Sequence, residues 1–356
     1  MKQKELTGKA QTVLGVIDAK DIGVTTCHEH ILWDITVNYQ EPVSANDKEM
    51  ALQPMSLDNL YWVRAHSHSN LDNMLQTDEQ LAIKELMHFK NAGGGTVVEL
   101  SQNGIHRNAA GLARIAQATG LNIIMGSGYY VSKSHPADMD DKTEEDIAGE
   151  IVQDIMEGVG DTGVCSGIIG EIGCSVPFTQ NEKKVLRACA IAQRRTGAAI
   201  NVHPSNDDGL VLENIEVLKD AGADLTRVAI SHVDGYELTP STRSKILEAG
   251  CYAEYDGFGQ SLYHFQYMGR IANAHSDIQR IDDIMQLIEE GYLDRILIAH
   301  DFCYKCNFAA YGGYGYGHII NNLLPFMRAK GMTEEQINAL VVENPRTFLQ
   351  FAPVEA

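Results

Sequence analysis

The stretch that decides the fold reads "SGIIGEIG" (166–173), then "TQNEKKVLRACAIAQRRTG" (179–197), then "AAINVH" (198–203). The first and last segments are short and nearly continuously apolar, which is typical of strands buried on both faces of a parallel sheet. In the middle segment the apolar residues recur at the spacing of one face of a helix. This segment opens with a capping-box pair, Thr179 and Glu182, and Gly197 is a suitable C-terminal stop. Together they predict one strand–helix–strand unit.

The same alternation of strand and helix patterns runs along most of the chain. Eight strand candidates, each followed by a helical pattern, occupy residues 22–28, 95–100, 122–127, 166–173, 198–203, 227–232, 251–256 and 295–301. Eight such units in about 280 residues favour one closed barrel over an open sheet. We therefore expect a single-domain (β/α)8 TIM barrel over residues 1–356, with its core at about 20–345. Residues 33–77 are polar and predict an insertion after the first strand.

Composition narrows the class of protein. The net charge of −20 argues against nucleic acid or an anionic membrane as a partner. No apolar run approaches the length of a membrane helix, and the first residues lack the apolar core of a signal peptide. The seven scattered cysteines do not suggest a disulfide framework, and the pair Cys303 and Cys306 has no second pair to complete a zinc ribbon. We expect a cytoplasmic protein that acts on a small molecule, and a homodimer is left open.

Polar residues fall at the ends of five of the predicted strands. In barrels of this kind the catalytic groups come from the carboxyl ends of strands. The candidates are His28, His30, Glu171, His203, His232 and Asp301. His28 and His30 are two residues apart and would share one face of a strand. A second pair, His66 and His68, lies in a polar stretch, and we interpret it as a solvated loop.

Four histidines and two carboxylates form a nitrogen and oxygen ligand set that suits zinc, or manganese or cobalt. Six ligands are too many for one catalytic zinc, which usually keeps three protein ligands. Two metals that share a bridging carboxylate fit the set better. Glu171 is acidic and central in the sequence, so we expect it to be the bridge.

The chain resembles the phosphotriesterase family of the amidohydrolase superfamily, and in particular its phosphotriesterase-related branch. The matching stretches are "TCHEH", "GIIGEIGCS", "AGADLTRVAISHVDG", "AEYDGFG", "RILIAHDFCYK", "YGGYGYGHI" and "ENP", between about residues 12 and 352. The resemblance implies a (β/α)8 barrel, a binuclear metal centre and hydrolysis of an ester, lactone, amide or phosphoester bond. It also implies that His28, His30 and Asp301 hold the more buried metal, that His203 and His232 hold the more exposed one, and that Glu171 bridges them.

Two residues depart from phosphotriesterases proper. Phosphotriesterases proper, which this chain resembles, bridge their metals with a carboxylated lysine at the position of Glu171. The phosphotriesterase-related branch has a glutamate there, as this chain does. Phosphotriesterases proper also have a relay histidine at the position of Gly257, directly after Asp256. The resemblance therefore implies a metal site but makes efficient triester hydrolysis less expected.

We expect the two ions to lower the pKa of a shared, bridging water so that hydroxide attacks a lactone or an N-acyl amide with a distal anionic group. Asp301 would be the catalytic base, and Asp234 would orient a ligand. The substrate-binding candidates from loops after strands are Tyr129, Tyr130, Tyr255 and Lys305, with Lys305 as the anion anchor. Two alternatives remain, namely an organophosphate hydrolase and a non-catalytic binding protein.

Overall fold

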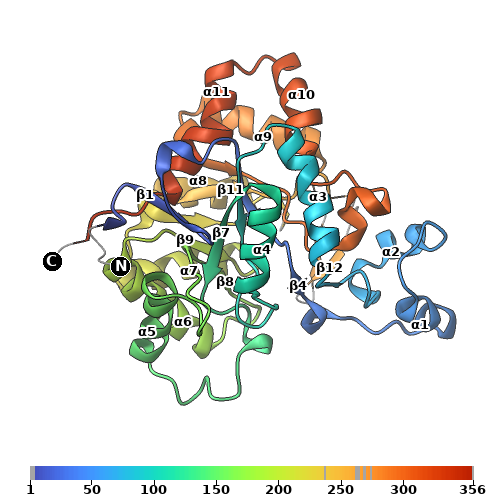
Figure 1. Ribbon diagram of the computed structural model, residues 1–356, viewed down its shortest axis with the longest axis horizontal. Coiled ribbons are helices and arrows are strands. Elements are labelled where there is room, and N and C mark those ends of the chain that lie inside the picture. Colours follow the sequence, from blue (N-terminus) through green and yellow to red (C-terminus); the bar gives the residue numbers. More distant parts are fainter. Residues whose placement is uncertain (1–4, 236–237, 261–264, 268–269, 273–274, 355–356) are drawn as a thin grey trace.

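The computed structural model describes residues 5–235, 238–260, 265–267, 270–272 and 275–354 of the chain (Figure 1). Eight parallel strands form the central sheet, in the order β3, β6, β7, β8, β9, β10, β11 and β14. Their bounds are Thr25–Glu29, Thr96–Glu99, Asn122–Ser127, Ile168–Gly173, Ile200–His203, Val228–Ile230, Tyr252–Tyr255 and Ile296–Ile298.

The sheet curls so that its last strand meets its first. Past the end of β14, the backbone N–H of Asp301 donates to the carbonyl of His28 at 3.0 Å, and the N–H of His300 donates to Oε1 of Glu29 at 3.1 Å. These contacts bring the two edge strands together into a nearly closed barrel. The predicted (β/α)8 barrel and its eight strands are confirmed.

Helices cover the outside of the barrel, as Figure 1 shows. They are α3 (Glu79–Asn91), α4 (Ala109–Thr119), α5 (Glu144–Met156), α6 (Gln180–Thr196), α7 (Asp208–Asp220), α8 (Pro240–Glu248), α9 (Asp277–Glu289), α10 (Leu324–Ala329), α11 (Glu334–Asn338) and α12 (Asn344–Leu349). Helix α6 begins with the predicted capping box of Thr179 and Glu182, and Gly197 ends it in the left-handed region at φ +77°. Short π-helical turns at Ile319–Leu323 and Ala339–Glu343 precede α10 and α12.

The smaller strand pairs lie outside the barrel sheet. Strands β1 (Lys9–Thr12) and β2 (Gly15–Asp18) form an N-terminal hairpin, and β12 (Phe265–Tyr267) pairs with β13 (Arg270–Ala272). No helix in the described part of the chain has the length and apolar character that crossing a membrane requires.

The insertion after the first barrel strand has its own small elements. Strands β4 (Trp33–Asp34) and β5 (Leu75–Gln76) pair antiparallel at its two ends, and α1 (Ala45–Leu52) and α2 (Leu60–Ala65) lie between them. Figure 1 shows α1 and α2 to one side of the barrel. The insertion returns a segment to the mouth of the barrel, where His68 is buried. The prediction of a solvated loop is therefore wrong for His68.

Part of the barrel interior is filled with small and apolar side chains. Among them, Cys27, Ala229 and Leu297 from three barrel strands pack with Phe348 of α12. The polar candidates lie beyond these side chains, at the carboxyl ends of the strands.

Candidate metal centre

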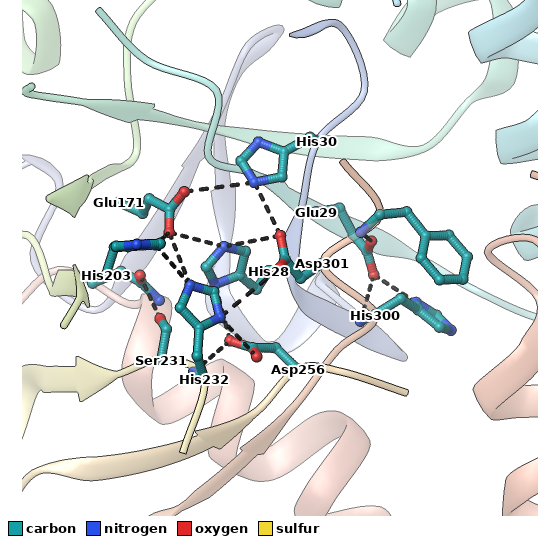
Figure 2. Close-up of polar contacts among 12 residues, drawn as sticks. His28, Glu29, His30, Glu171, His203, Ser231, His232, Asp256, His300 and Asp301 are labelled. Atoms are coloured by element: carbon teal, nitrogen blue, oxygen red, sulfur yellow. Dashed lines mark hydrogen bonds and ion pairs between the residues drawn. The ribbon is translucent and has the colours of Figure 1, made fainter. Parts of the chain in front are cut away.

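All six residues predicted at strand ends meet at the carboxyl end of the barrel (Figure 2). They are His28, His30, Glu171, His203, His232 and Asp301. The Glu171 carboxylate lies at the middle of the group. Its Oε1 is 3.6 Å from Nε2 of His30, and its Oε2 is 3.0 Å from Nδ1 of His203. The structure therefore brings all six sequence candidates together.

Each oxygen of Glu171 faces a different part of the cluster. On one side, Oδ1 of Asp301 is 3.1 Å from Nε2 of His30 and 3.7 Å from Nε2 of His28. On the other side, Nε2 of His232 is 2.9 Å from Nδ1 of His203 and 3.3 Å from Oε2 of Glu171. Nε2 of His28 also lies 3.4 Å from Oε2 of Glu171, the oxygen that faces His203 and His232, so the carboxylate contacts ligand atoms of all four histidines.

The spacing of these atoms fits metal ions. Four ligands that each lie about 2.0–2.2 Å from a tetrahedral zinc are about 3.3–3.6 Å from one another. The ligand atoms of His28, His30 and Asp301 lie within 4.8 Å of one another, as do those of His28, Glu171 and His232. Nε2 of His28 is fully buried and makes no hydrogen bond within the described residues, although it lies 3.4 Å from Oε2 of Glu171 and 3.7 Å from Oδ1 of Asp301. A buried ring nitrogen in that condition is costly unless an ion or water completes it, so these residues could hold metal.

The backbone is strained where two of the candidates leave their strands. His232 has φ +56° and Asp301 has φ +50°. Non-glycine residues rarely adopt this left-handed region, and each such residue costs about 1–3 kcal/mol. The surrounding contacts hold the strained residues in place. For example, the N–H of His232 donates to Oδ2 of Asp256 at 3.0 Å.

A layer of buried polar groups fixes the imidazoles from behind. Nδ1 of His28 is 3.1 Å from Oε2 of Glu254, and Nδ1 of His30 is 2.9 Å from Oγ of Ser101. Nδ1 of His232 is 2.9 Å from Oδ1 of Asp256. Partners of this kind set the tautomer of a ligating histidine and leave its other nitrogen for the metal.

The charges of the cluster depend strongly on one another. Burial opposes ionisation of Glu171, but His203 and His28 outweigh it and hold the pKa of the Glu171 carboxyl well below its usual value. Burial likewise opposes charge on His28, yet Glu171 and Glu254 hold the pKa of that imidazole well above its usual value. Protonated histidines therefore balance the negative charge of the carboxylates in the cluster. Bound cations would balance that charge in their place.

The polar layer behind the cluster was not predicted from the sequence, although a signal for part of it was present. Glu254 and Asp256 are two residues apart in "CYAEYD", so they share one face of an otherwise apolar strand end. No comparable signal marked Arg280, which reaches the site from helix α9.

A pocket opens above the cluster. Its lining includes His30, Glu171, His203, His232 and Asp301 from the cluster, Tyr130, Asp234, Asp256, Gly257, Gln260, Arg280, Cys303 and Tyr304 from the barrel loops and helices, and Ile35, Asn38 and His68 from the insertion. Nε2 of His68 is 2.8 Å from the Tyr304 hydroxyl, which joins the insertion to the loop after β14.

The substrate-binding candidates separate into two groups. Tyr130 lines the pocket, and its hydroxyl is 3.5 Å from Nδ1 of His203. Tyr129, Tyr255 and Lys305 are not among the lining residues. The Tyr129 hydroxyl donates to Glu150 at 2.5 Å, and the ammonium of Lys305 is paired with Asp72. Tyr255 is fully buried.

Asp234 takes a different place from the one predicted. The carboxylates that directly contact ligand candidates are Asp256, beside His232, and Glu254, beside His28. Asp234 lies one step further out, where it pairs with Arg280 and accepts the N–H of Gly257 at 3.1 Å. Its contact with the cluster is therefore indirect.

Comparison with known proteins identifies the family to which the chain belongs. The chain matches the phosphotriesterase family over residues 8–349. It is 38% identical over 348 residues to an N-acetyltaurine hydrolase of Danio rerio, an alignment covering 98% of this chain and 99% of the relative. It is 39% identical over 351 residues to a phosphotriesterase-related protein of Nematostella vectensis, covering 97% of this chain and 99% of the relative.

A solved structure also has the same fold. The resiniferatoxin-binding protein of Rhodobacter sphaeroides superposes with a TM-score of 0.92 at 33% identity, covering 96% of this chain and 95% of that one. The match to the family spans nearly the whole chain. The chain is a hydrolase, and it belongs to the phosphotriesterase family.

Proposed function

We propose that the chain hydrolyses N-acyl amides with a short anionic tail and that it uses two divalent ions to do so. Zinc is the preferred metal, with manganese or cobalt as alternatives, because the ligand set combines imidazoles and carboxylates. Relatives named N-acetyltaurine hydrolase match almost the full length of the chain. N-acetyltaurine is an amide with a sulfonate tail, so it represents the substrate class that we propose.

The observation that carries the proposal is the position of Glu171. One carboxylate oxygen faces His30, and the other faces His28, His203 and His232. A carboxylate placed in this way suits a bridge between two cations. We assign His28, His30 and Asp301 to the more buried ion, and His203 and His232 to the other.

When bound, the ions would lower the pKa of a water molecule and polarise the substrate carbonyl. Asp301 is the residue suited to accept the proton of that water. Its side chain keeps 17% of its exposure, whereas that of Glu171 keeps 2%. Gln260 donates from Nε2 to the Asp301 carbonyl at 3.0 Å and is 3.4 Å from Oδ2, which holds the residue in place.

The same proton then goes to the leaving nitrogen. Cleavage of the C–N bond needs a protonated amine, because an amide anion is a poor leaving group, and Asp301 returns the proton to that nitrogen. The products are a carboxylate and a free amine. Tyr130 faces the pocket beside His203 and is placed to donate its hydroxyl to the substrate carbonyl oxygen.

The test compares substrate classes on zinc-loaded protein. The panel contains N-acetyltaurine, a simple lactone and a phosphotriester of the paraoxon type, and metal content is measured on the same preparation. We expect close to two ions per chain and the highest kcat/KM for N-acetyltaurine. Asp301→Asn should lower this kcat/KM by at least about a hundredfold. Highest activity on the phosphotriester, or no bound metal after loading, would contradict the proposal.

A further inference from the structure

Arg280 is a buried cation at the edge of the pocket. It lies on α9 and is 1% exposed, yet it lines the pocket. Among the described residues, it is the only lysine or arginine in that lining. A buried arginine is normally satisfied at every face of its guanidinium.

Two carboxylates hold the guanidinium in one orientation. Nε of Arg280 donates to Oδ2 of Asp234, and Nη1 donates to Oδ1 of Asp277 at 3.2 Å. Asp277 is held in turn by His318, whose Nε2 lies 2.7 Å from Oδ2. Nη2 has no protein acceptor among the described residues, so one edge of the guanidinium remains available for a ligand.

Gly257 makes room for this free edge. A Cβ atom at Gly257 would lie 2.2 Å from Nη2 of Arg280 and 2.9 Å from Oδ2 of Asp234. Any other residue at position 257 would therefore displace the guanidinium. Glycine lets Nη2 lie directly against the backbone of the pocket wall.

The position of Arg280 relates it to the cluster. Gly257 follows Asp256, and the Asp256 carboxylate contacts His232. A substrate whose carbonyl lies at the metal ligands would therefore bring a group on a short linker to Arg280. A guanidinium with a free N–H is a strong donor to sulfonate or carboxylate oxygens.

We propose that Arg280 binds the anionic tail of the substrate and sets the preference of the enzyme for short N-acyl amides that end in a sulfonate or carboxylate. This assignment rests on the proposed function for the reacting bond. It differs from the sequence-based expectation of Lys305, because Arg280 lines the pocket and Lys305 does not.

The experiment uses two substrates that differ only in charge. N-acetyltaurine carries a sulfonate, and N-[2-(methylsulfonyl)ethyl]acetamide carries a neutral sulfone of similar shape. Parent, Arg280→Lys and Gly257→Ala are compared by kcat/KM. The dissociation constants of both compounds are measured by calorimetry in an Asp301→Asn background, where turnover is suppressed.

Arg280→Lys removes the Nη2 donor but keeps a cation near Asp234. Gly257→Ala keeps the arginine but pushes its free edge aside. Each variant should lower kcat/KM for the sulfonate by about ten- to a hundredfold, mainly through KM. The sulfone should change by less than about threefold in both variants. Arg107→Lys is the matched control, because Arg107 pairs with Asp154 in a similarly buried site that does not line the pocket.

The outcomes separate the two proposals. If the parent hydrolyses neither amide but binds the sulfonate more tightly than the sulfone, and the variants lose that difference, the assignment of Arg280 holds and the proposed reaction fails. If the parent binds both compounds equally, or both variants keep the preference, the assignment of Arg280 is wrong. Loss of the preference in Lys305→Met alone would place the anion at Lys305 and would also overturn it.

Discussion

Oδ1 of Asp256 lies 2.9 Å from Nδ1 of His232, on the opposite side of the imidazole from the Nε2 atom that faces Glu171. Asp256 also accepts the N–H of His232, at 3.0 Å, so it fixes both the ring and the backbone of this residue. Burial raises the pKa of Asp256, although His232 opposes the shift. Burial outweighs the imidazole, so the pKa of Asp256 rises to about 7, and a cation bound at His232 would favour the charged carboxylate that orients the ring.

Asp256→Asn should weaken metal binding at the site of His203 and His232. The amide keeps the shape of the side chain but loses the charge that orients the imidazole. The expected loss of zinc affinity is about ten- to a hundredfold for one of the two ions. Competition with a chelator measures it, and Asp294→Asn, at an exposed residue, is the control. Two unchanged affinities would show that Asp256 does not act on a metal ligand.

Glu171→Gln should reduce the metal content from about two ions per chain toward one. A bridging carboxylate offsets the repulsion between two cations, and a neutral amide cannot do so. Elemental analysis after dialysis against a weak chelator gives the stoichiometry. A variant that retains both ions with parental affinity would remove Glu171 from the role of bridge.

Tyr130→Phe and Tyr129→Phe form a matched pair at adjacent positions. The Tyr130 hydroxyl faces the pocket, whereas the Tyr129 hydroxyl donates to Glu150. Loss of one hydrogen bond to the substrate carbonyl should lower kcat/KM for N-acetyltaurine about tenfold in Tyr130→Phe. Tyr129→Phe should keep kcat/KM within about twofold. Steady-state kinetics on both variants would reverse the assignment if Tyr129→Phe were the impaired one.

His68 should make folding sensitive to acid. Burial lowers the pKa of His68 to about 4, while an unfolded histidine titrates near about 6.5. The unfolded chain therefore gains this proton first as the pH falls. The contribution of His68 to the free energy of unfolding is therefore fully present above about pH 6.5. It is lost as the pH falls from there to about 4, and the total loss is about 3 kcal/mol.

His68→Gln should flatten this dependence. The free energy of unfolding, measured by urea titration at pH 7, 6 and 5, should fall less steeply in the variant than in the parent. His66→Gln is the control, because His66 is exposed. Equal slopes for the parent and His68→Gln would mean that His68 is charged in the folded protein.

Much of the barrel and all six cluster residues followed from the sequence because both depend on local patterns. Apolar runs mark buried strands, and a polar residue at the end of such a run is conspicuous. Glu171 is an example, since it interrupts "IIGEIG" at a point where both neighbours are buried. The observed strands begin and end a few residues away from the predicted bounds. Strand ends depend on hydrogen bonds to neighbouring strands, which the local sequence pattern does not show.

The pocket wall was harder to predict because its residues come from distant parts of the chain. Arg280 lies within an amphipathic helix, where an arginine normally faces solvent, and only its pairing with Asp234 turns it inward. His68 lies in a polar stretch, and only its contact with Tyr304, 236 residues further along, shows that it is buried. Lys305 is close to Asp301 in sequence, yet its side chain pairs with Asp72 of the insertion.

The hydrogen bond between His68 and Tyr304 joins the insertion to the barrel at the pocket. The shape of the pocket wall and the ligand cluster can therefore change independently, because they come from different parts of the chain. The ligand candidates belong to the strands, whereas Ile35, Asn38 and His68 reach the pocket from the insertion. Loops tolerate replacement far better than buried strands do. Replacement of residues 33–77 can therefore change the shape of the pocket while the ligand candidates at the strand ends stay the same.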